Sequence, residues 1–294
     1  KSKIIRKYVK QKSIDKVWLI MLMQLMPFLP FLLPKRIKIT GIIYRLYLYE
    51  FSKMSAVRLF LEKVRYWILA KNSKIEKAFI LNDVEMVNVL NNRYNTSHFY
   101  YLPDPIPKID RSKLKDIKEE IGISQKAIMY LHFGGLTKRK GTLEILKAIQ
   151  LLDVRDLEDK AFVFAGKLYP DINKEFYDLL DDIKHKVKII VFDEFCSPEH
   201  LNNLCYSCDV ILIPYTNTNQ SSGVIGYAAY FGKPVVGPKG GLLGHLIESY
   251  NMGVTMESVE AGNLSRLIKK TIPICNSEYG KSHTVNDFLN SFMA

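Results

Sequence analysis

A regular alternation of strand-like and helix-like segments between residues 127 and 270 is the feature that most limits how this chain can fold. Strands and helices that alternate at this pace form a parallel, doubly wound sheet, and such sheets bind ligands beyond the carboxyl ends of their strands. The sequence therefore predicts an α/β fold with a ligand site at that edge. Short apolar runs predict the buried strands at 127–133, 161–165, 187–192, 209–214 and 234–236.

Amphipathic segments between these strands predict the helices. Ser197 before Pro198 marks one start clearly, because this pair is typical of the N-cap and the first position of a helix. Other helices are expected from near residue 141, around Phe176, and over 223–231, 242–250 and 257–270.

The first third of the chain is less regular. Three prolines within residues 103–107 make a stiff, extended connector and indicate a domain boundary. A helix over 54–71 carries an apolar stripe of Val57, Leu61, Val64 and Ile68. Strands are expected at 17–23, 36–44, 77–81 and 99–102, with a bulge or a close approach at Gly41 and a helix capped by Asn82 and Asp83.

Positive charge is concentrated in the first quarter of the chain. Residues 1–75 hold 17 Lys and Arg but three Asp and Glu, a net charge of +14. Residues 76–294 hold 25 basic and 27 acidic side chains, a net charge of −2. This distribution disfavours a nucleic-acid binder with a uniformly basic surface and indicates a local basic face.

An apolar run at 17–33 raises the alternative of a transmembrane helix. Pro27 and Pro30 lie inside the run, whose length is only just sufficient to span a bilayer, so a buried strand and a proline-rich turn are favoured. The run also lacks the cleavage pattern of a signal peptide. Because the region is basic as well as apolar, we expect it to contact an anionic membrane surface.

The four cysteines do not form a recognisable disulfide or metal framework. A disulfide-stapled domain uses more cysteines in a shorter chain, and Cys205-x-x-Cys208 has no second pair at zinc-ligand spacing. We interpret these cysteines as small apolar residues packed before a strand. The expected location is the reducing cytoplasm, with any membrane contact at the inner face.

The loop 134–141 follows a predicted strand and combines glycines with positive charge. Gly134 and Gly135 allow a close backbone approach, and Lys138, Arg139 and Lys140 stand directly before a helix. That combination suits a phosphate or diphosphate. The spacing is neither that of a Walker loop nor that of a dinucleotide fingerprint. A tight turn with solvated charges is the alternative interpretation.

Two further loops favour the ligand-binding interpretation. Residues 216–223 are small and polar and precede an apolar helix, and residues 237–244 are rich in glycine before another helix. Free N–H groups at a helix start can bind an anion, although an ordinary polar loop explains the first of these loops equally well. Three such loops after strands of one domain are less expected by chance than any single one.

Four segments, taken in order, resemble a known family. Their order and spacing resemble the C-terminal domain of GT-B glycosyltransferases, and most closely the family 4 type (glycosyl transferases group 1) that builds bacterial surface polysaccharides. The resemblance covers about residues 100–270, and residues 36–100 resemble the latter half of the family's N-terminal domain more weakly. The segments are Phe-Gly-Gly-Leu-(x)3-Lys-Gly at 133–141, Val-Phe-Ala-Gly at 163–166, Cys-Asp-Val-Ile-Leu-Ile-Pro at 208–214 and Ala-Ala-Tyr-Phe-Gly-Lys-Pro-Val-Val at 228–236.

The resemblance implies a GT-B fold, in which two Rossmann-like domains face a cleft that binds a nucleotide diphosphate sugar. Arg139 and Lys140, beside Gly134 and Gly135, match the family's diphosphate-binding loop. A charge clamp of this kind stabilises the leaving nucleoside diphosphate, so no metal or other cofactor is expected. The remaining donor-binding residues implied by the resemblance are Phe192 and Asp193 near the base, and Asn219, Gln220, Ser221, Ser222, Gly223 and Tyr227 near the sugar and phosphates.

Three residues depart from the family pattern. Asn219 and Tyr227 occupy the positions of two glutamates that the family usually carries eight residues apart, and Gly135 stands where many members have arginine. An amide such as Asn219 or Gln220 can hydrogen-bond sugar hydroxyls but cannot act as a carboxylate base. The catalytic residues are therefore left unassigned.

The resemblance also implies a division into domains. Residues 1–106 are expected to form the acceptor-side domain, 107–274 the donor-binding domain, and 275–294 a helix that crosses back to the first domain. The family's first strand and acceptor loop would precede residue 1, so we expect an incomplete N-terminal domain. The histidines that could be mistaken for a base are interpreted as structural: His98, His132 and His245.

The leading hypothesis is a glycosyltransferase that moves a sugar from a nucleotide diphosphate sugar to a polysaccharide or lipid-linked acceptor. Retention of anomeric configuration is implied by the resemblance. Two alternatives stay open. One is a nucleotide-sugar epimerase of the same fold, for which the sequence offers no convincing acid and base. The other is a nucleotide-sugar-binding protein without catalysis, which the two missing glutamates favour.

Overall fold

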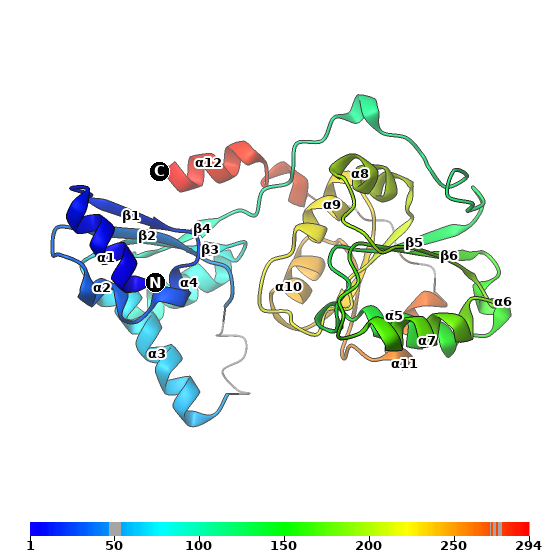
Figure 1. Ribbon diagram of the computed structural model, residues 1–294, viewed down its shortest axis with the longest axis horizontal. Coiled ribbons are helices and arrows are strands. Elements are labelled where there is room, and N and C mark those ends of the chain that lie inside the picture. Colours follow the sequence, from blue (N-terminus) through cyan, green and yellow to red (C-terminus); the bar gives the residue numbers. More distant parts are fainter. Residues whose placement is uncertain (47–53, 271, 273–274, 276–277, 294) are drawn as a thin grey trace. The chain divides into compact units, whose positions relative to one another are not determined.

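The computed structural model describes residues 1–46, 54–270, 272, 275 and 278–293, which fall into two compact units (Figure 1). Each unit has its own parallel sheet and its own hydrophobic core. The first unit comprises Lys1–Asp104, Asn219–Ser221 and Asn286–Ala294, and the second comprises Pro105–Thr218 and Ser222–Val285.

A six-stranded parallel sheet forms the centre of the second unit, with the strand order β10-β9-β8-β5-β6-β7. Its inner strands are continuous apolar runs because helices cover both faces of the sheet. The predicted doubly wound α/β fold is confirmed. The strands are β5 (Ile128–Phe133), β6 (Lys160–Ala165), β7 (Lys188–Phe192), β8 (Val210–Leu212), β9 (Val235–Pro238) and β10 (Gly253–Met256).

Helices lie on both sides of this sheet, with α5, α7 and α11 on one face and α8, α9 and α10 on the other (Figure 1). The core beneath α5 and α7 includes Phe164 and Phe176, whose rings meet edge to face with centroids 5.4 Å apart. The helices are α5 (Thr142–Gln150), α6 (Val154–Leu157), α7 (Asn173–Ile183), α8 (Pro198–Ser207), α9 (Gly223–Phe231), α10 (Gly241–Ser249) and α11 (Ala261–Ile268).

Most predicted elements of this unit are confirmed within a few residues, although the start of one helix is wrong and helix α6 and strand β10 were not predicted. The start of α8 is confirmed, because Ser197 Oγ accepts a hydrogen bond from His200 N at 3.2 Å and Pro198 is the first helical residue. The helix predicted over 257–270 is wrong at its start, since α11 begins at Ala261. Strand β10, which precedes α11, was not predicted because it is a four-residue edge strand.

Two cysteines of this unit, Cys205 and Cys208, behave as packed apolar residues. Cys205 and Cys208 are fully buried at the end of α8, and both are free thiols. Burial raises the pKa of each thiol, so neither is a reactive thiolate at neutral pH.

A four-stranded parallel sheet in the order β1-β2-β3-β4 forms the first unit. Gly41 permits the close approach predicted for it, because a Cβ there would lie 2.7 Å from Leu19 O. The unit contains β1 (Lys16–Leu19), β2 (Lys38–Ile43), β3 (Ile75–Leu81) and β4 (Phe99–Leu102), with the helices α1 (Ser2–Gln11), α2 (Leu29–Leu32), α3 (Ala56–Lys71), α4 (Val84–Tyr94) and α12 (Val285–Met293).

The apolar run 17–33 folds into several short pieces. The strand predicted over 17–23 ends early at Leu19, and a 3-10 turn, η1 (Leu22–Leu25), follows before α2. Leu22 and Leu29 are fully buried in the core of the first unit. No helix in the part of the chain that the structure describes is long and apolar enough to cross a membrane.

Helix α12 packs on one face of the first unit's sheet. Phe292 lies with its ring centroid 4.7 Å from that of Trp18 and 5.4 Å from that of Phe79. Successive side chains of a strand point to opposite faces. Phe79 and Leu81 therefore face α12, whereas Ile80 belongs to the core that contains side chains of α3 and α4.

Candidate functional site

The strand order of the second unit reverses between β5 and β8. The chain runs outward from β5 through β6 to β7, then returns to place β8 on the other side of β5. At such a switch point the loops after the two strands diverge and leave a crevice at the carboxyl edge. Here these are the loop 134–141 and the loop that follows Leu212, two of the three loops singled out in the sequence.

The loop 134–141 is held in a defined shape. Lys138–Lys140 form one 3-10 turn, η4, in which Thr137 Oγ1 accepts a hydrogen bond from Lys140 N at 3.3 Å. Gly141 has φ +70°, and a Cβ there would overlap the carbonyl oxygen of Pro214, so only glycine fits. The Arg139 carbonyl accepts hydrogen bonds from Thr216 N (3.0 Å) and Thr216 Oγ1 (3.1 Å). These bonds join the loop after β5 to the loop after β8.

Lys140 folds back over the start of its own loop. Its Nζ lies 3.4 Å from Phe133 O, in space that exists because Gly134 has no Cβ. Tyr215 lies beneath the two cations, with its ring centroid 5.4 Å from Lys140 Nζ and 6.0 Å from Arg139 Cζ. Burial, reinforced by the charge of Arg139, lowers the pKa of Lys140 to about 8. The ammonium is therefore charged at neutral pH but poorly solvated, a state that an anion would relieve.

His132 supports this loop from within the core. The fully buried ring places Nδ1 2.9 Å from Leu212 O and Nε2 3.0 Å from Thr142 Oγ1, and Thr142 Oγ1 accepts a hydrogen bond from Thr137 N at 3.1 Å. Burial lowers the pKa of His132 to about 4, so the ring is neutral at pH 7. Nδ1–H then donates to Leu212 O, and Nε2 accepts from Thr142. The ring thereby ties β5 to β8 and to the start of α5.

The loops after β6 and β7 meet at the same edge. Asp193 Oδ1 accepts a hydrogen bond from Leu168 N at 2.7 Å and lies 3.1 Å from Lys167 Nζ. The bond from the Leu168 amide lowers the pKa of Asp193. This carboxylate therefore holds the loop after β6. Gly166 has φ +142°, and a Cβ there would overlap Gly134 O. The loop after β6 is therefore in direct contact with the loop after β5.

Three helices start at this edge with their N–H groups unsatisfied by the helix itself, which gives each start a partial positive charge. They are α5, α9 and α10. Ser222 is the N-cap of α9, and Tyr227, one turn further, packs edge to face on Phe133 with centroids 5.6 Å apart. Gly241, the first residue of α10, packs against Thr218.

Residues 219–221 belong to the first unit. There Ser221 Oγ donates to Asp104 Oδ2 at 2.5 Å and accepts from Asn82 Nδ2 at 3.0 Å, and burial raises the pKa of Asp104. The backbone nitrogen of Leu46 donates to Asn219 O at 2.9 Å. The predicted loop 216–223 is thus divided between the two units.

The structure brings most of the predicted donor-binding residues to one edge of the second sheet. Asn219, Gln220 and Ser221 are the exceptions, being grouped with the first unit. Gly135 lies beside the ring of Tyr169, which a Cβ would approach to 3.2 Å. The residues at the common edge are Gly134, Gly135, Arg139, Lys140, Phe192, Asp193, Ser222, Gly223 and Tyr227.

Two parts of the site were not predicted from the sequence. Tyr215, which lies beneath the cations, directly follows Pro214, the last residue of the strand predicted at 209–214. Its position at the end of a predicted strand is the sequence signal that could have identified it. The link from His132 to Thr142 has no local signal, because it joins a strand residue to a helix start. Among the described residues no group of three His, Cys, Asp or Glu side chains comes together in a way that could hold a metal ion.

The sequence of the second unit matches a known protein family. The family profile of the glycosyl transferases group 1 matches residues 114–274, which is more than half of the chain. That range contains all the loops of the carboxyl edge described above. No curated protein sequence matches the chain.

Solved structures are similar to the whole chain at low sequence identity. One is Anabaena Alr3699/HepE in complex with UDP and glucose, with 16% identity, a TM-score of 0.68, and coverage of 99% of this chain and 76% of that one. Another is a glycosyltransferase from Rickettsia africae ESF-5, with 15% identity, a TM-score of 0.67, and coverage of 99% and 78%.

A third similar structure is WaaG, a glycosyltransferase involved in lipopolysaccharide biosynthesis, with 15% identity, a TM-score of 0.63, and coverage of 99% and 77%. At these identities the likeness concerns the fold, whereas the family profile concerns the sequence of the second unit. The chain has the GT-B fold and belongs to the glycosyl transferases group 1.

Proposed function

We propose that this glycosyltransferase takes its sugar from a nucleotide diphosphate sugar bound at the carboxyl edge of the second unit's sheet, against the loops after β5 and β8. The observation that carries the proposal is the pair of cations at the start of α5. Arg139 and Lys140 stand over Tyr215 at a helix N-terminus, and neither is joined to a carboxylate by any ion pair among the described residues. Two adjacent positive charges and free amide groups are complementary to a diphosphate.

This arrangement favours the departure of the nucleoside diphosphate. When the bond between the sugar and the diphosphate breaks, negative charge grows on the leaving phosphate oxygens and positive charge grows on the sugar ring. Lys140 and Arg139 are held in place before the reaction, so they stabilise that negative charge without reorganising. The proposal includes retention of anomeric configuration, which rests on the family resemblance.

The acceptor that we propose is a polysaccharide or a lipid-linked glycan. The charge of +14 in residues 1–75 supports an acidic or membrane-associated acceptor side. WaaG, one of the structural neighbours, acts in lipopolysaccharide biosynthesis. HepE was solved with UDP and glucose, so UDP-glucose is the first donor to test.

Calorimetric titration with UDP, GDP, ADP, CDP and TDP tests the donor site directly. We expect one of these nucleotides to bind with a single site per chain. Absence of binding by all five would overturn the proposal. The matching nucleotide sugar, incubated without acceptor and analysed by NMR, separates the alternatives. Isomerised donor indicates an epimerase, and binding without turnover toward any glycan acceptor indicates a binding protein.

The affinity for a nucleoside diphosphate is expected to fall above pH 8. Only the charged form of Lys140 attracts the diphosphate, and this side chain loses its proton near pH 8 in the free protein. The dissociation constant should change little from pH 6.5 to about 7, begin to rise as the pH approaches 8, and rise by up to about tenfold per pH unit above that. Titration calorimetry across pH 6.5–9.5 measures this directly.

Two variants isolate the contribution of Lys140 to that pH dependence. Lys140→Arg keeps its charge throughout the range and should bind with a nearly constant affinity. Lys138→Arg, at an exposed position of the same turn, should keep the decline of the unmodified protein. A decline that persists in Lys140→Arg would assign the titration to another group.

A further inference from the structure

Helix α3 presents apolar side chains to solvent along the apolar stripe that the sequence predicts. Of the stripe residues Val57, Leu61, Val64 and Ile68, only Ile68 is buried, whereas Val57 is 72% and Leu61 is 52% exposed. The amino-terminal half of α3 projects beyond the sheet of the first unit (Figure 1). No described element of that unit covers this half of the helix.

Two large aromatic residues extend the same exposed stripe. Phe60 is 65% exposed and Trp67 is 55% exposed. They stand seven positions apart, which places them on one side of a helix. The buried side of α3 carries Leu69 and Ala70 and also a charged residue, Glu62. Glu62 is paired with Arg65, whose Nη1 lies 2.6 Å from Glu62 Oε1. The exposed apolar surface is therefore larger than a surface helix of this length normally shows.

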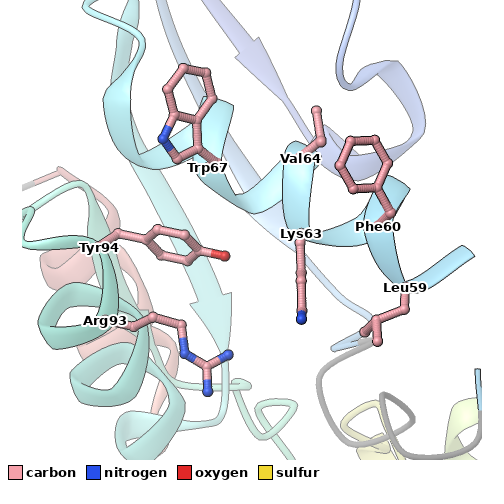
Figure 2. A pocket seen from close by; sticks show the side chains of 7 residues that line it. All are labelled: Leu59, Phe60, Lys63, Val64, Trp67, Arg93 and Tyr94. Atoms are coloured by element: carbon pink, nitrogen blue, oxygen red, sulfur yellow. The ribbon is translucent and has the colours of Figure 1, made fainter. Parts of the chain in front are cut away.

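A shallow groove of about 630 Å³ lies between α3 and α4 along this stripe (Figure 2). Trp67 and Tyr94 contribute aromatic rings with a polar atom at one end. Figure 2 shows the side chains of Lys63 and Arg93 extending to the same side of the groove. The lining that the described residues form contains no acidic side chain. It consists of Leu59, Phe60, Lys63, Val64, Trp67, Arg93 and Tyr94.

The positive charge around the groove favours an anionic partner over a second copy of this chain. Neither Lys63 nor Arg93 takes part in an ion pair within the described ranges. The first 75 residues carry a net charge of +14. Two copies of such a surface repel each other, so self-association through it is disfavoured. An anionic bilayer instead offers a negative surface for the cations and an apolar layer for the stripe.

We propose that the α3 face, defined as Val57, Phe60, Leu61, Val64 and Trp67 with the flanking Lys63 and Arg93, docks this protein on an anionic lipid bilayer. The apolar stripe enters the boundary between head groups and acyl chains, where Trp and Tyr side chains are favourable. Lys63 and Arg93 reach back to the lipid phosphates, as long cationic side chains do at this depth. The inference rests on the proposed function only in that a bilayer holds a lipid-linked acceptor.

Trp67 reports on this docking directly. The chain has two tryptophans, and Trp18→Phe leaves Trp67 as the single emitter. We expect a blue shift of its emission on addition of vesicles of phosphatidylglycerol and phosphatidylcholine, and quenching by brominated acyl chains. Pure phosphatidylcholine vesicles should produce neither change at low salt. Neither measurement needs donor or acceptor, so a failure here is distinct from a failure of the proposed transfer reaction.

Substitutions on the α3 face measure its contribution by vesicle co-sedimentation. Phe60→Ser and Trp67→Ser should each weaken partitioning about tenfold. The double variant with Lys63→Gln and Arg93→Gln should weaken partitioning onto anionic vesicles about tenfold or more. Phe195→Ser is the matched apolar control, because Phe195 is 91% exposed in the second unit. Lys174→Gln with Lys184→Gln is the charge control. Both controls should bind like the unmodified protein.

Several outcomes would overturn the proposal. They are absence of binding to anionic vesicles at low salt, equal binding by the Phe60→Ser and Trp67→Ser variants, and equal losses in the controls. A dimer in solution that Trp67→Ser converts to monomer would instead assign the face to self-association. Because the substituted side chains are exposed, the variants should keep the thermal transition of the unmodified protein, which verifies that they fold.

Discussion

Alanine at Lys140 is expected to weaken binding of the preferred nucleoside diphosphate by about ten- to 150-fold at pH 7. The lost contact is a hydrogen bond between a charged donor and a charged acceptor, which contributes about 1.5–3 kcal/mol. Arg139→Ala should weaken binding by a similar factor. Titration calorimetry with each variant measures both effects, and Lys138→Ala is the control, since Lys138 is exposed in the same turn.

The stability of the Lys140 variant separates binding from folding. The pKa of Lys140 is lowered from 10.5 to about 8, so the folded state disfavours the charged form that predominates at pH 7. The charge of Lys140 therefore destabilises the folded state by about 3 kcal/mol at pH values below 8. This destabilisation decreases above pH 8 and is absent above pH 10.5. Lys140→Met keeps most of the stem without the charge. It should therefore unfold at a higher denaturant concentration while binding weakly.

A single result would remove the first loop from the site. Unchanged affinity in both Arg139→Ala and Lys140→Ala would show that the diphosphate binds elsewhere. A loss of affinity with a matching loss of stability would instead assign these residues a structural role. The combination expected here, weaker binding in a fold of equal or greater stability, is typical of residues whose arrangement serves a ligand.

The loops of the carboxyl edge were predictable because their signals are local. Glycine directly after a strand or directly before a helix marks a conformation that other residues avoid. Gly134 and Gly166 follow strands, Gly141 precedes α5, and all three have positive φ. Cationic residues before a helix start are equally visible in a short window. The family resemblance rests on the same short segments, which is why it covers the second unit well and the first unit weakly.

Contacts between distant segments were not predictable in this way. An amphipathic pattern shows which side of a helix is apolar but not whether anything covers it. The sequence therefore predicted the stripe of α3 but not that Val57 and Leu61 are exposed. Strand β10 has four residues and one neighbour, too little for a periodic signal. The positions of Tyr215 and His132 depend on which strands become neighbours, and no local window contains that information.

The catalytic groups remain unassigned for a related reason. Asn219 and Tyr227 stand where the family usually carries glutamates, and neither supplies a carboxylate. Tyr227 packs on Phe133 and burial raises its pKa, so it is a neutral hydroxyl at pH 7. Among the residues at the carboxyl edge, the carboxylate of Asp193 is engaged by Leu168 N and Lys167. In the proposed function, stabilisation of the leaving group is therefore the part of catalysis assigned to the second unit.

The stability of the second unit is expected to fall as the pH is lowered from 6.5 to 4. His132→Gln should remove the part of this pH dependence that His132 contributes. The pKa of His132 is about 4 in the folded protein and about 6.5 when unfolded, so between these values the unfolded chain binds one more proton. This group's contribution is present in full above pH 6.5 and is lost as the pH falls to 4, with a total of about 3 kcal/mol.

Urea unfolding at pH 7, 6, 5 and 4.5 measures the slope. His132→Gln should unfold more easily at pH 7, because an amide side chain fits the bonds to Leu212 O and Thr142 Oγ1 less well than the ring does. Its stability should nevertheless change less with pH than that of the unmodified protein. His185 is an exposed histidine of the same unit, so His185→Gln should keep the original slope.

Equal slopes in the unmodified protein and His132→Gln would mean that His132 is not held neutral. The ring could then not accept from Thr142 through Nε2, and the tie between β5 and the basic loop would have to be made by another group.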